Sequence, residues 1–159
     1  MRIVKAERTD LREILQLQHL AFQSEAKLLG NDQIPPLLQT LPELEDELRR
    51  GVVLKAVDDE GNLIGSVRGY VEENTLHIGK LIVQPALQGR GIGRKLMDAI
   101  EQLYPHARYE IFTSSKSARN IRMYENRGYR AFKTKATAGV TIVYMEKHGC
   151  FREANTTVA

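Results

Sequence analysis

Residues 81–101 read LIVQPALQGRGIGRKLMDAIE and decide the fold class of this chain. They pass from an apolar segment, through a turn with three glycines, into a segment with helical periodicity. The glycines are Gly89, Gly91 and Gly93, and the basic residues beside them are Arg90, Arg94 and Lys95. Glycines let successive backbone N–H groups converge on one anion, and the start of the following helix adds partial positive charge. We therefore expect a pyrophosphate site here, the alternative being a plain strand-to-helix connection.

The position of this turn argues against two familiar nucleotide-binding folds. A dinucleotide-binding fold places its glycine turn after the first strand, with an acidic residue about 20 positions later. Here the turn follows the fourth expected strand. A P-loop is excluded because no Gly-Lys-Ser/Thr sequence closes the turn.

Hydrophobic periodicity and turn signals predict an α/β fold with a mixed, mostly antiparallel sheet flanked by helices. We expect strands at residues 2–6, 52–57, 63–71, 75–83, 107–115, 129–135 and 139–147. We expect helices at residues 9–27, 43–50, 91–104 and 117–128. These elements form one domain over residues 1–147, followed by a loose tail at residues 148–159.

Local signals predict where the first helix begins, where the last helix ends and where helix is interrupted. Thr9 or Asp10 caps the first helix, with Glu13 completing a capping-box pattern. Pro35 and Pro36 forbid helix in the segment that follows it. Gly128 closes the last helix.

Composition limits the class of protein. The chain has 159 residues, of which 42% are hydrophobic, and 23 basic against 20 acidic residues give a net charge of only +3. This excess is too small to indicate a nucleic-acid partner. A single cysteine, Cys150, excludes an intramolecular disulfide, and no apolar run approaches the roughly 20 residues of a membrane span. The first residues carry charges where a signal peptide needs an apolar core. We expect a soluble, cytoplasmic protein without a membrane partner.

The strand before the turn has an irregular pattern. The large apolar residues Leu76 and Ile78 occupy even-numbered positions, whereas Leu81 and Val83 occupy odd-numbered positions. Because side chains alternate along a strand, this change predicts a β-bulge near Gly79 that would open a cleft beside the turn. A strand buried on both faces is the alternative.

Two motifs give the chain a family resemblance. The run Gln88-Gly89-Arg90-Gly91-Ile92-Gly93 resembles the Gln/Arg-x-x-Gly-x-Gly/Ala core of the GNAT superfamily of N-acetyltransferases. The second motif of that family, an Asn followed by Tyr-Glu-x-x-Gly-Tyr/Phe, reads NIRMYENRGY at residues 120–129. The motifs flank one strand in the family's order, so the similarity covers roughly residues 1–147.

The resemblance implies an acyltransferase that uses acetyl-coenzyme A as its donor substrate and needs no metal. It implies direct attack by an amine in a ternary complex, without an acyl-enzyme. Pyrophosphate would bind the backbone of Gln88, Gly89, Arg90, Gly91, Ile92, Gly93 and Arg94. Pantetheine would pair with Leu81 and Val83 and contact Asn120. Tyr124 would protonate the departing thiolate, the alternative for this residue being an aromatic side chain packed on a helix face.

A general base is not assigned. Many members of the resembled family carry a glutamate where this chain has Gly79. His77, Glu110 and Glu25 are alternatives, as is a chain of water molecules. His19 and His106 lack the spacing of metal ligands.

The resemblance favours a small-molecule amine as the acceptor. A protein lysine or N-terminal amine is the alternative within the enzymes, and a non-catalytic acyl-coenzyme A binding module is the alternative outside them. The acidic run at residues 43–48 could bind a cationic amine, although a solvated helix face is the preferred interpretation. Homodimers are common in the resembled family, so a homodimer is one expectation.

Overall fold

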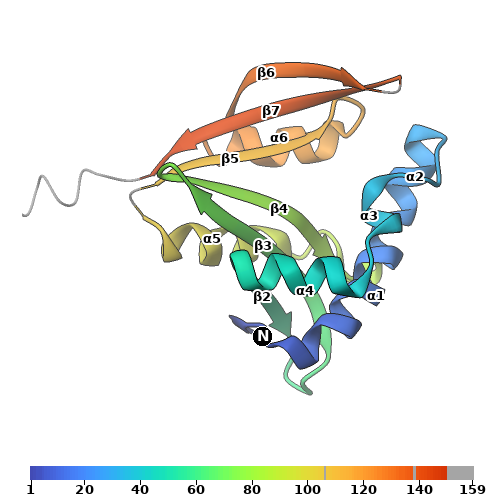
Figure 1. Cartoon of the computed structure of the whole chain (residues 1–159), viewed down its shortest axis with the longest axis vertical. Coiled ribbons are helices and arrows are strands. Elements are labelled where there is room, and N and C mark those ends of the chain that lie inside the picture. Colours follow the sequence, from blue (N-terminus) through green and yellow to red (C-terminus); the bar gives the residue numbers. More distant parts are fainter. Residues whose placement is uncertain (106, 138, 150–159) are drawn as a thin grey trace, which may run out of the picture. The chain divides into compact units, whose positions relative to one another are not determined.

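A computed structural model describes residues 1–105, 107–137 and 139–149 and contains a seven-stranded sheet with helices (Figure 1). The strands are β1 Arg2–Lys5, β2 Val52–Val57, β3 Leu63–Glu72, β4 Thr75–Val83, β5 Arg108–Ser114, β6 Arg130–Thr137 and β7 Val140–His148. Their order in the sheet is β1-β2-β3-β4-β5-β7-β6. Strands β4 and β5 are parallel, whereas β1–β2, β2–β3, β5–β7 and β6–β7 are antiparallel. The expected α/β fold with a mixed, mostly antiparallel sheet is confirmed.

Helical segments connect the strands. The α-helices are α1 Leu11–Ala21, α2 Gln23–Leu29, α3 Pro35–Leu38, α4 Leu41–Arg50, α5 Ile92–Leu103 and α6 Ala118–Asn126. Two 3-10 turns, η1 Arg8–Asp10 and η2 Pro85–Leu87, precede α1 and α5. No described helix is long and apolar enough to cross a membrane.

The described chain forms two compact units. The first comprises residues 1–70 and 78–100, and the second comprises residues 71–77 and 101–149. The expectation of one domain over residues 1–147 stays a prediction. Of the expected tail, His148 ends β7 and the N–H of Gly149 donates to the carbonyl of Ala107 at 2.7 Å. Cys150 and the rest of the tail lie outside the described residues, as does His106.

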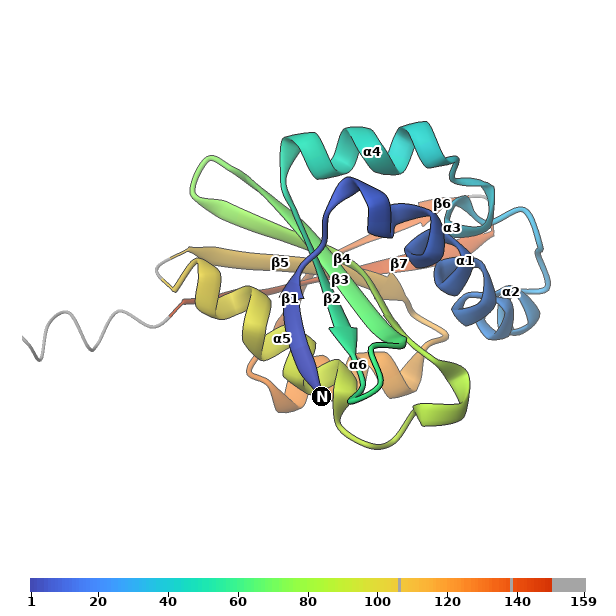
Figure 2. The same ribbon diagram turned by 90° about the horizontal axis from the view of Figure 1, so that it is seen from below.

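In the first unit, helices pack on both faces of the sheet. Helices α1 and α4 lie on one side of strands β1–β3 and α5 lies on the other (Figure 2). Ala6, Leu11, Ile14, Leu44 and Val53 form the buried cluster beneath α1 and α4.

Asp10 is the N-cap residue of α1, as expected, but three other expectations about the first helices are wrong. The capping box lies one turn early, since the N–H of Glu7 donates to the carboxylate of Asp10 at 2.8 Å and opens η1 rather than α1. Pro35 and Pro36 do not forbid helix, because they occupy the first positions of α3, where a missing N–H costs nothing. The expected helix 9–27 is also divided, with Phe22 between α1 and α2.

Strand β4 is irregular one residue after the expected position. Lys80 adopts a left-handed φ of 51°, which is uncommon for a residue with a side chain. The expected change from even-numbered to odd-numbered buried positions is absent, because Ile82 is buried like Leu76 and Ile78. Leu81 and Val83 are only half-buried.

The buried cluster predicts how one leucine of α4 contributes to stability. We expect Leu44→Ala to lower the free energy of unfolding by about 2–5 kcal/mol, because Leu44 is fully buried and its removal leaves a cavity. Leu38→Ala is the matched control, since Leu38 is 54% exposed and its truncation opens no cavity. Urea unfolding of both variants tests this, and equal losses would contradict it.

Candidate functional site

The segment that leads into the glycine turn is hydrogen-bonded to the sheet. The N–H of Gln84 donates to the carbonyl oxygen of Ile64 in β3 at 2.9 Å, and η2 follows. Gly89 and Gly91 then adopt left-handed φ values of 80° and 83°. An L-residue with a side chain is strained in this region, so glycine is required at both positions.

Helix α5 begins directly after this turn. The N–H of Lys95 donates to the carbonyl of Gly91 at 3.1 Å, so Gly91 opens the helix. The N–H groups of the first turn of a helix have no carbonyl partner within it, and they carry its partial positive charge. The exposed residues around this helix start are Gln88, Gly89, Arg90, Arg94 and Lys95. The turn therefore combines exposed backbone amides with three basic side chains.

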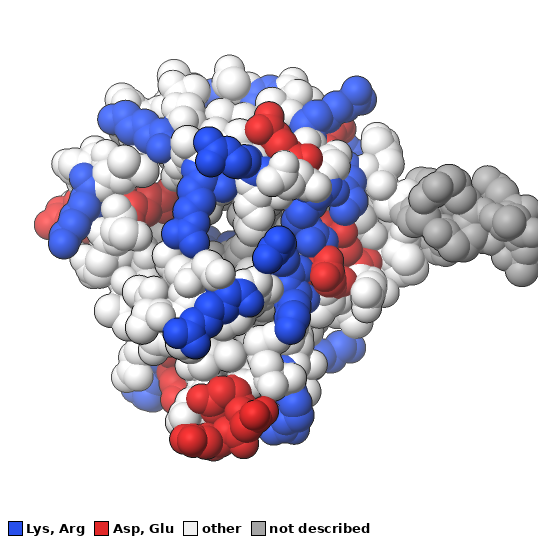
Figure 3. Space-filling view, turned by 180° about the vertical axis from the view of Figure 1, so that it is seen from behind, with Lys and Arg blue, Asp and Glu red and all other residues white. Residues whose placement is uncertain are grey.

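Basic side chains are conspicuous on one face of the surface. Lys and Arg outnumber Asp and Glu on the face seen in Figure 3, while acidic side chains gather over the turn between β2 and β3. That turn contains Asp58, Asp59 and Glu60.

The third glycine of the motif has a different role. Gly93 lies inside α5, and a Cβ there would lie 3.8 Å from Cδ2 of Leu81 and 3.8 Å from Cγ2 of Val83. The side chains of these β4 residues therefore lie close to the first turn of the helix. The structure thus brings together the glycine turn and both β4 residues expected to hold pantetheine.

The second unit contains the other two expected site residues, both on α6. Asn120 is exposed, whereas Tyr124 is 5% exposed and its ring lies 6.0 Å from that of Tyr129. The N–H of Tyr129 donates to the carbonyl of Tyr124, and the N–H of Gly128 donates to that of Glu125, both at 3.0 Å. With Gly128 at a φ of 95°, these bonds form a Schellman motif. Gly128 therefore closes α6, as expected.

A buried carboxylate stabilises the end of α6. Glu101 accepts a hydrogen bond from the Tyr129 hydroxyl at 2.7 Å and from Nζ of Lys147 at 2.8 Å, and Nη2 of Arg127 lies 3.2 Å away. Burial, and then the negative charge of Glu101, raise the pKa of the Tyr129 phenol well above its usual value. We name these four residues the Glu101 cluster. Because Tyr129 packs against Tyr124, the cluster holds Tyr124 in place.

The residues weighed as a general base are engaged in other contacts. The carboxylate of Glu110 lies 2.9 Å from Nη1 of Arg108 and 3.6 Å from Nδ1 of His77. A Cβ added to Gly79 would meet no atom within 4 Å. Glu25 is half-buried on α2. None of these contacts assigns a base.

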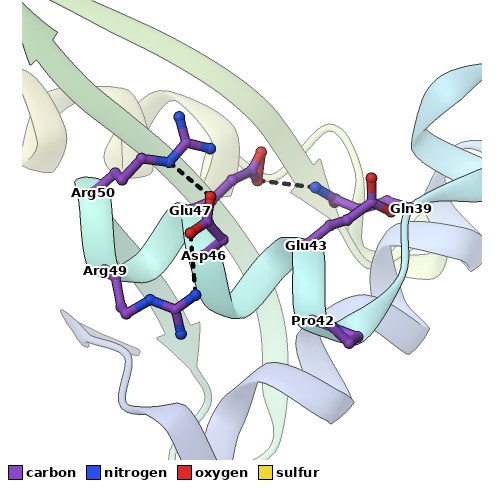
Figure 4. A pocket seen from close by; sticks show the side chains of 7 residues that line it. All are labelled: Gln39, Pro42, Glu43, Asp46, Glu47, Arg49 and Arg50. Atoms are coloured by element: carbon purple, nitrogen blue, oxygen red, sulfur yellow. Dashed lines mark hydrogen bonds and ion pairs between the residues drawn. The ribbon is translucent and has the colours of Figure 1, made fainter.

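Two cavities in the first unit lie along helices α3 and α4. They were not predicted from the sequence. The larger has a volume of about 500 Å³ and is lined by Gln39, Pro42, Glu43, Asp46, Glu47, Arg49 and Arg50 (Figure 4). The smaller has a volume of about 290 Å³ and is lined by Pro35, Leu38, Gln39, Glu43 and Lys80. The sequence signals near them were the acidic run of residues 43–48 and the segment of residues 24–40, which the family resemblance associates with acceptor specificity. Within the described ranges, no group of three or more His, Cys, Asp or Glu side chains could hold a metal ion.

Comparison with known proteins extends these observations. The family described as "Acetyltransferase (GNAT) family" matches residues 10–129. The UPF0157 protein YqkA of Bacillus subtilis (strain 168) is 28% identical over 138 residues, which are 86% of this chain. The chain spans only 39% of the length of that relative.

Solved structures share the fold. The ribosomal-protein-S18-alanine N-acetyltransferase of Escherichia coli superposes with a TM-score of 0.77 at 15% identity, over 94% of each chain. The PaiA N-acetyltransferase of Thermoplasma acidophilum, in complex with coenzyme A, has a TM-score of 0.77 at 16% identity. That match covers 92% of this chain and 98% of the other.

The Glu101 cluster predicts a large effect of removing one charge. We expect Glu101→Gln to lower the free energy of unfolding by about 1.5–3 kcal/mol, because two partly buried cations lose their charged partner. Glu125→Gln on the exposed face of α6 is the matched control and should change it by less than about 0.5 kcal/mol. Urea unfolding compares the two variants. Similar unfolding midpoints would show that the cluster adds no stability.

Proposed function

The chain belongs to the acetyltransferase (GNAT) family, and we propose that it transfers the acetyl group of acetyl-coenzyme A to a primary amine. The enzyme class expected from the sequence, an acyltransferase of the N-acetyltransferase kind, is the class of this family. The observation that carries the proposal is the turn in which Gly89 and Gly91 adopt left-handed conformations directly before the start of α5.

The shape of the turn fits a pyrophosphate. A Cβ on Gly89 would meet no protein atom within 4 Å, so the space beside its backbone is open. A Cβ on Gly91 would lie 3.4 Å from Nη2 of Arg94, which places that guanidinium beside the same backbone. Backbone N–H groups of residues 88–94 would bind the phosphates, and Arg90 and Arg94 would offset their charge.

The pantetheine arm would lie along the second half of β4. The described pairing of β4 with β5 covers Thr75, Leu76 and His77, so Leu81 and Val83 lie beyond it. An extended pantetheine would pair with their backbone groups as an added strand does. Asn120 would contact the same part of the donor.

We propose direct transfer in a ternary complex. The free amine nitrogen bonds to the thioester carbonyl carbon, the carbon–sulfur bond breaks, and the amine loses a proton to water. Tyr124 donates its phenolic proton to the departing sulfur and then regains a proton from water. The reference pKa values of a thiol, about 8.5, and a phenol, about 10, make this proton transfer feasible.

A small-molecule amine is the acceptor that we favour. The cavities along α3 and α4, of about 290 and 500 Å³, have volumes near or within the range of small-ligand sites. A protein amine is the second candidate acceptor, because the ribosomal-protein N-acetyltransferase with the same fold is named for a protein substrate. Cytoplasmic location, the absence of a nucleic-acid partner, the need for no metal and a homodimeric state stay predictions.

Ligand-induced stabilisation tests the donor site. Acetyl-coenzyme A at about 100 times its dissociation constant should add about 2.7 kcal/mol, which raises the Tm by several degrees. Free acetate and a dinucleotide should not raise it. No shift with saturating acetyl-coenzyme A would contradict the proposal.

A matched pair of glycine variants tests whether the Tm shift with acetyl-coenzyme A arises from binding at the glycine turn. Gly89→Ala and Gly61→Ala introduce the same strain, because both glycines have a left-handed φ and open space beside them. Each should cost about 1 kcal/mol of stability. Only Gly89→Ala should reduce the shift with acetyl-coenzyme A. Equal shifts in both variants would place the ligand elsewhere.

Tyr124→Phe tests the proposed acid. A general acid contributes roughly 100-fold or more to a rate, so turnover should fall by at least that factor while the shift with acetyl-coenzyme A persists. Tyr70→Phe on the exposed end of β3 is the control and should leave turnover unchanged. Steady-state kinetics measure both. Normal turnover in Tyr124→Phe would remove this residue from the mechanism.

A further inference from the structure

A buried polar network in the first unit surrounds one guanidinium. Arg68 of β3 is only 6% exposed, and its Nη2 donates to Oε1 of Gln18 on α1. Its Nη1 lies 3.3 Å from Oε2 of Glu47 on α4 but makes no hydrogen bond. Burial lowers the pKa of Arg68 to about 10, and the charge of Glu47 opposes that shift. Arg68 therefore retains hydrogen-bonding capacity in a site shielded from water.

Two glutamines complete the network. Nε2 of Gln18 donates to Oε1 of Gln39 and to the carbonyl of Pro36, both at 2.9 Å. Nε2 of Gln39 in turn donates to Oε2 of Glu47 at 3.0 Å (Figure 4). The network thus joins α1, the α3–α4 connection and α4, and it positions Gln39, which lines both cavities.

A second cation lies at the wall of the smaller cavity. Lys80 lines it together with Gln39 and Glu43, and within the described part of the chain its ammonium group makes no hydrogen bond or ion pair. Burial, and then the positive charge of Arg68, lower the pKa of Lys80, while Glu47 opposes this. Its left-handed backbone is strained, and such strain persists only where surrounding structure maintains it.

Lys80 and Glu43 both line the smaller cavity, and their side chains form no ion pair with each other. Glu47 is the carboxylate that opposes the lowering of both the Arg68 and the Lys80 pKa. Glu43 is the other acidic residue at the wall, but its Oε1 accepts from the N–H and the hydroxyl of Thr40, both at 2.9 Å, as the cap of α4. These bonds lower the pKa of Glu43 and engage one of its oxygens with Thr40 rather than with Lys80. Lys80 is only partly exposed, so an anionic ligand that accepted a hydrogen bond from its ammonium group would be stabilising.

We propose that Lys80 binds a carboxylate of the acceptor at the smaller cavity, so that the acceptor is an amino acid or a similarly small amine that bears a carboxylate. The proposal rests on the proposed function and names its substrate class. Lys80 directly precedes Leu81, where the pantetheine arm is expected, so a carboxylate held there would keep the amine of a small acceptor near the donor. A volume of about 290 Å³ suits such a molecule.

The experiment compares paired acceptors that differ in the anionic group, with each rate expressed per concentration of free amine, because the amide lowers the pKa of the neighbouring amine. The purified chain, with acetyl-coenzyme A, is offered α-amino acids and the corresponding α-amides, and coenzyme A release is measured. We expect kcat/KM to favour the acid of a pair by about tenfold to 100-fold, the value of a charge-assisted hydrogen bond. Lys80→Met should abolish this preference, and Lys80→Arg should retain most of it. Lys27→Met, on the exposed face of α2, is the matched control and should keep the preference intact.

Each other outcome overturns the proposal. Equal use of acids and amides by the wild-type chain would show that no carboxylate is bound, as would a preference that survives in Lys80→Met. An equal loss of turnover for acids and amides in Lys80→Met, not restored by Lys80→Arg and accompanied by a changed pH profile, would make Lys80 a general base instead. Failure of every carboxylate-bearing amine, while acetyl-coenzyme A still raises the Tm, would overturn the substrate class alone. Loss of that Tm shift as well would overturn the donor site and the proposal with it.

Discussion

Burial of one face of α5 is the constraint on which the candidate donor site depends. Leu96, Met97 and Ile100 are fully buried, and each such side chain contributes about 1.5–3 kcal/mol relative to exposure. These contacts fix the helix, so its first N–H groups have a fixed position after the glycine turn. The bond from Gln84 to Ile64 fixes the other end of the turn. A short flexible segment thereby becomes a preorganised array of backbone donors, which costs a bound anion little ordering entropy.

Local rules predicted most of the elements because their signals lie within a few residues of each other. The left-handed turn at Gly89 and Gly91 and the closure of α6 at Gly128 follow from the freedom of glycine. The same rules were misleading at Pro35, where a proline begins a helical turn instead of preventing one. They were also misleading in β4, where the apolar run of residues 81–83 suggested a change of buried face. In the structure Lys80 absorbs the irregularity, and Ile82 remains the buried residue.

Contacts distant in sequence could not be predicted. Glu101 meets Tyr129 and Lys147, which lie 28 and 46 positions later, and Arg68 meets Gln18, which lies 50 positions earlier. No periodicity or spacing relates such residues, because the sheet topology alone brings them together. The two motifs therefore predicted the proposed donor site, whereas the proposed acceptor site depends on tertiary contacts among α1, α3, α4 and β3. This division explains why the sequence alone named a donor and left the acceptor open.

The Glu101 cluster gives the chain an internal reporter. Tyr129 shares its proton with a buried carboxylate, and both burial and that negative charge oppose formation of a phenolate. In an alkaline ultraviolet titration, Tyr129 would therefore contribute no phenolate absorbance as long as its hydrogen bond to Glu101 is intact. The appearance of its phenolate absorbance would mark the opening of the second unit, observed without a label, at the residue that supports Tyr124.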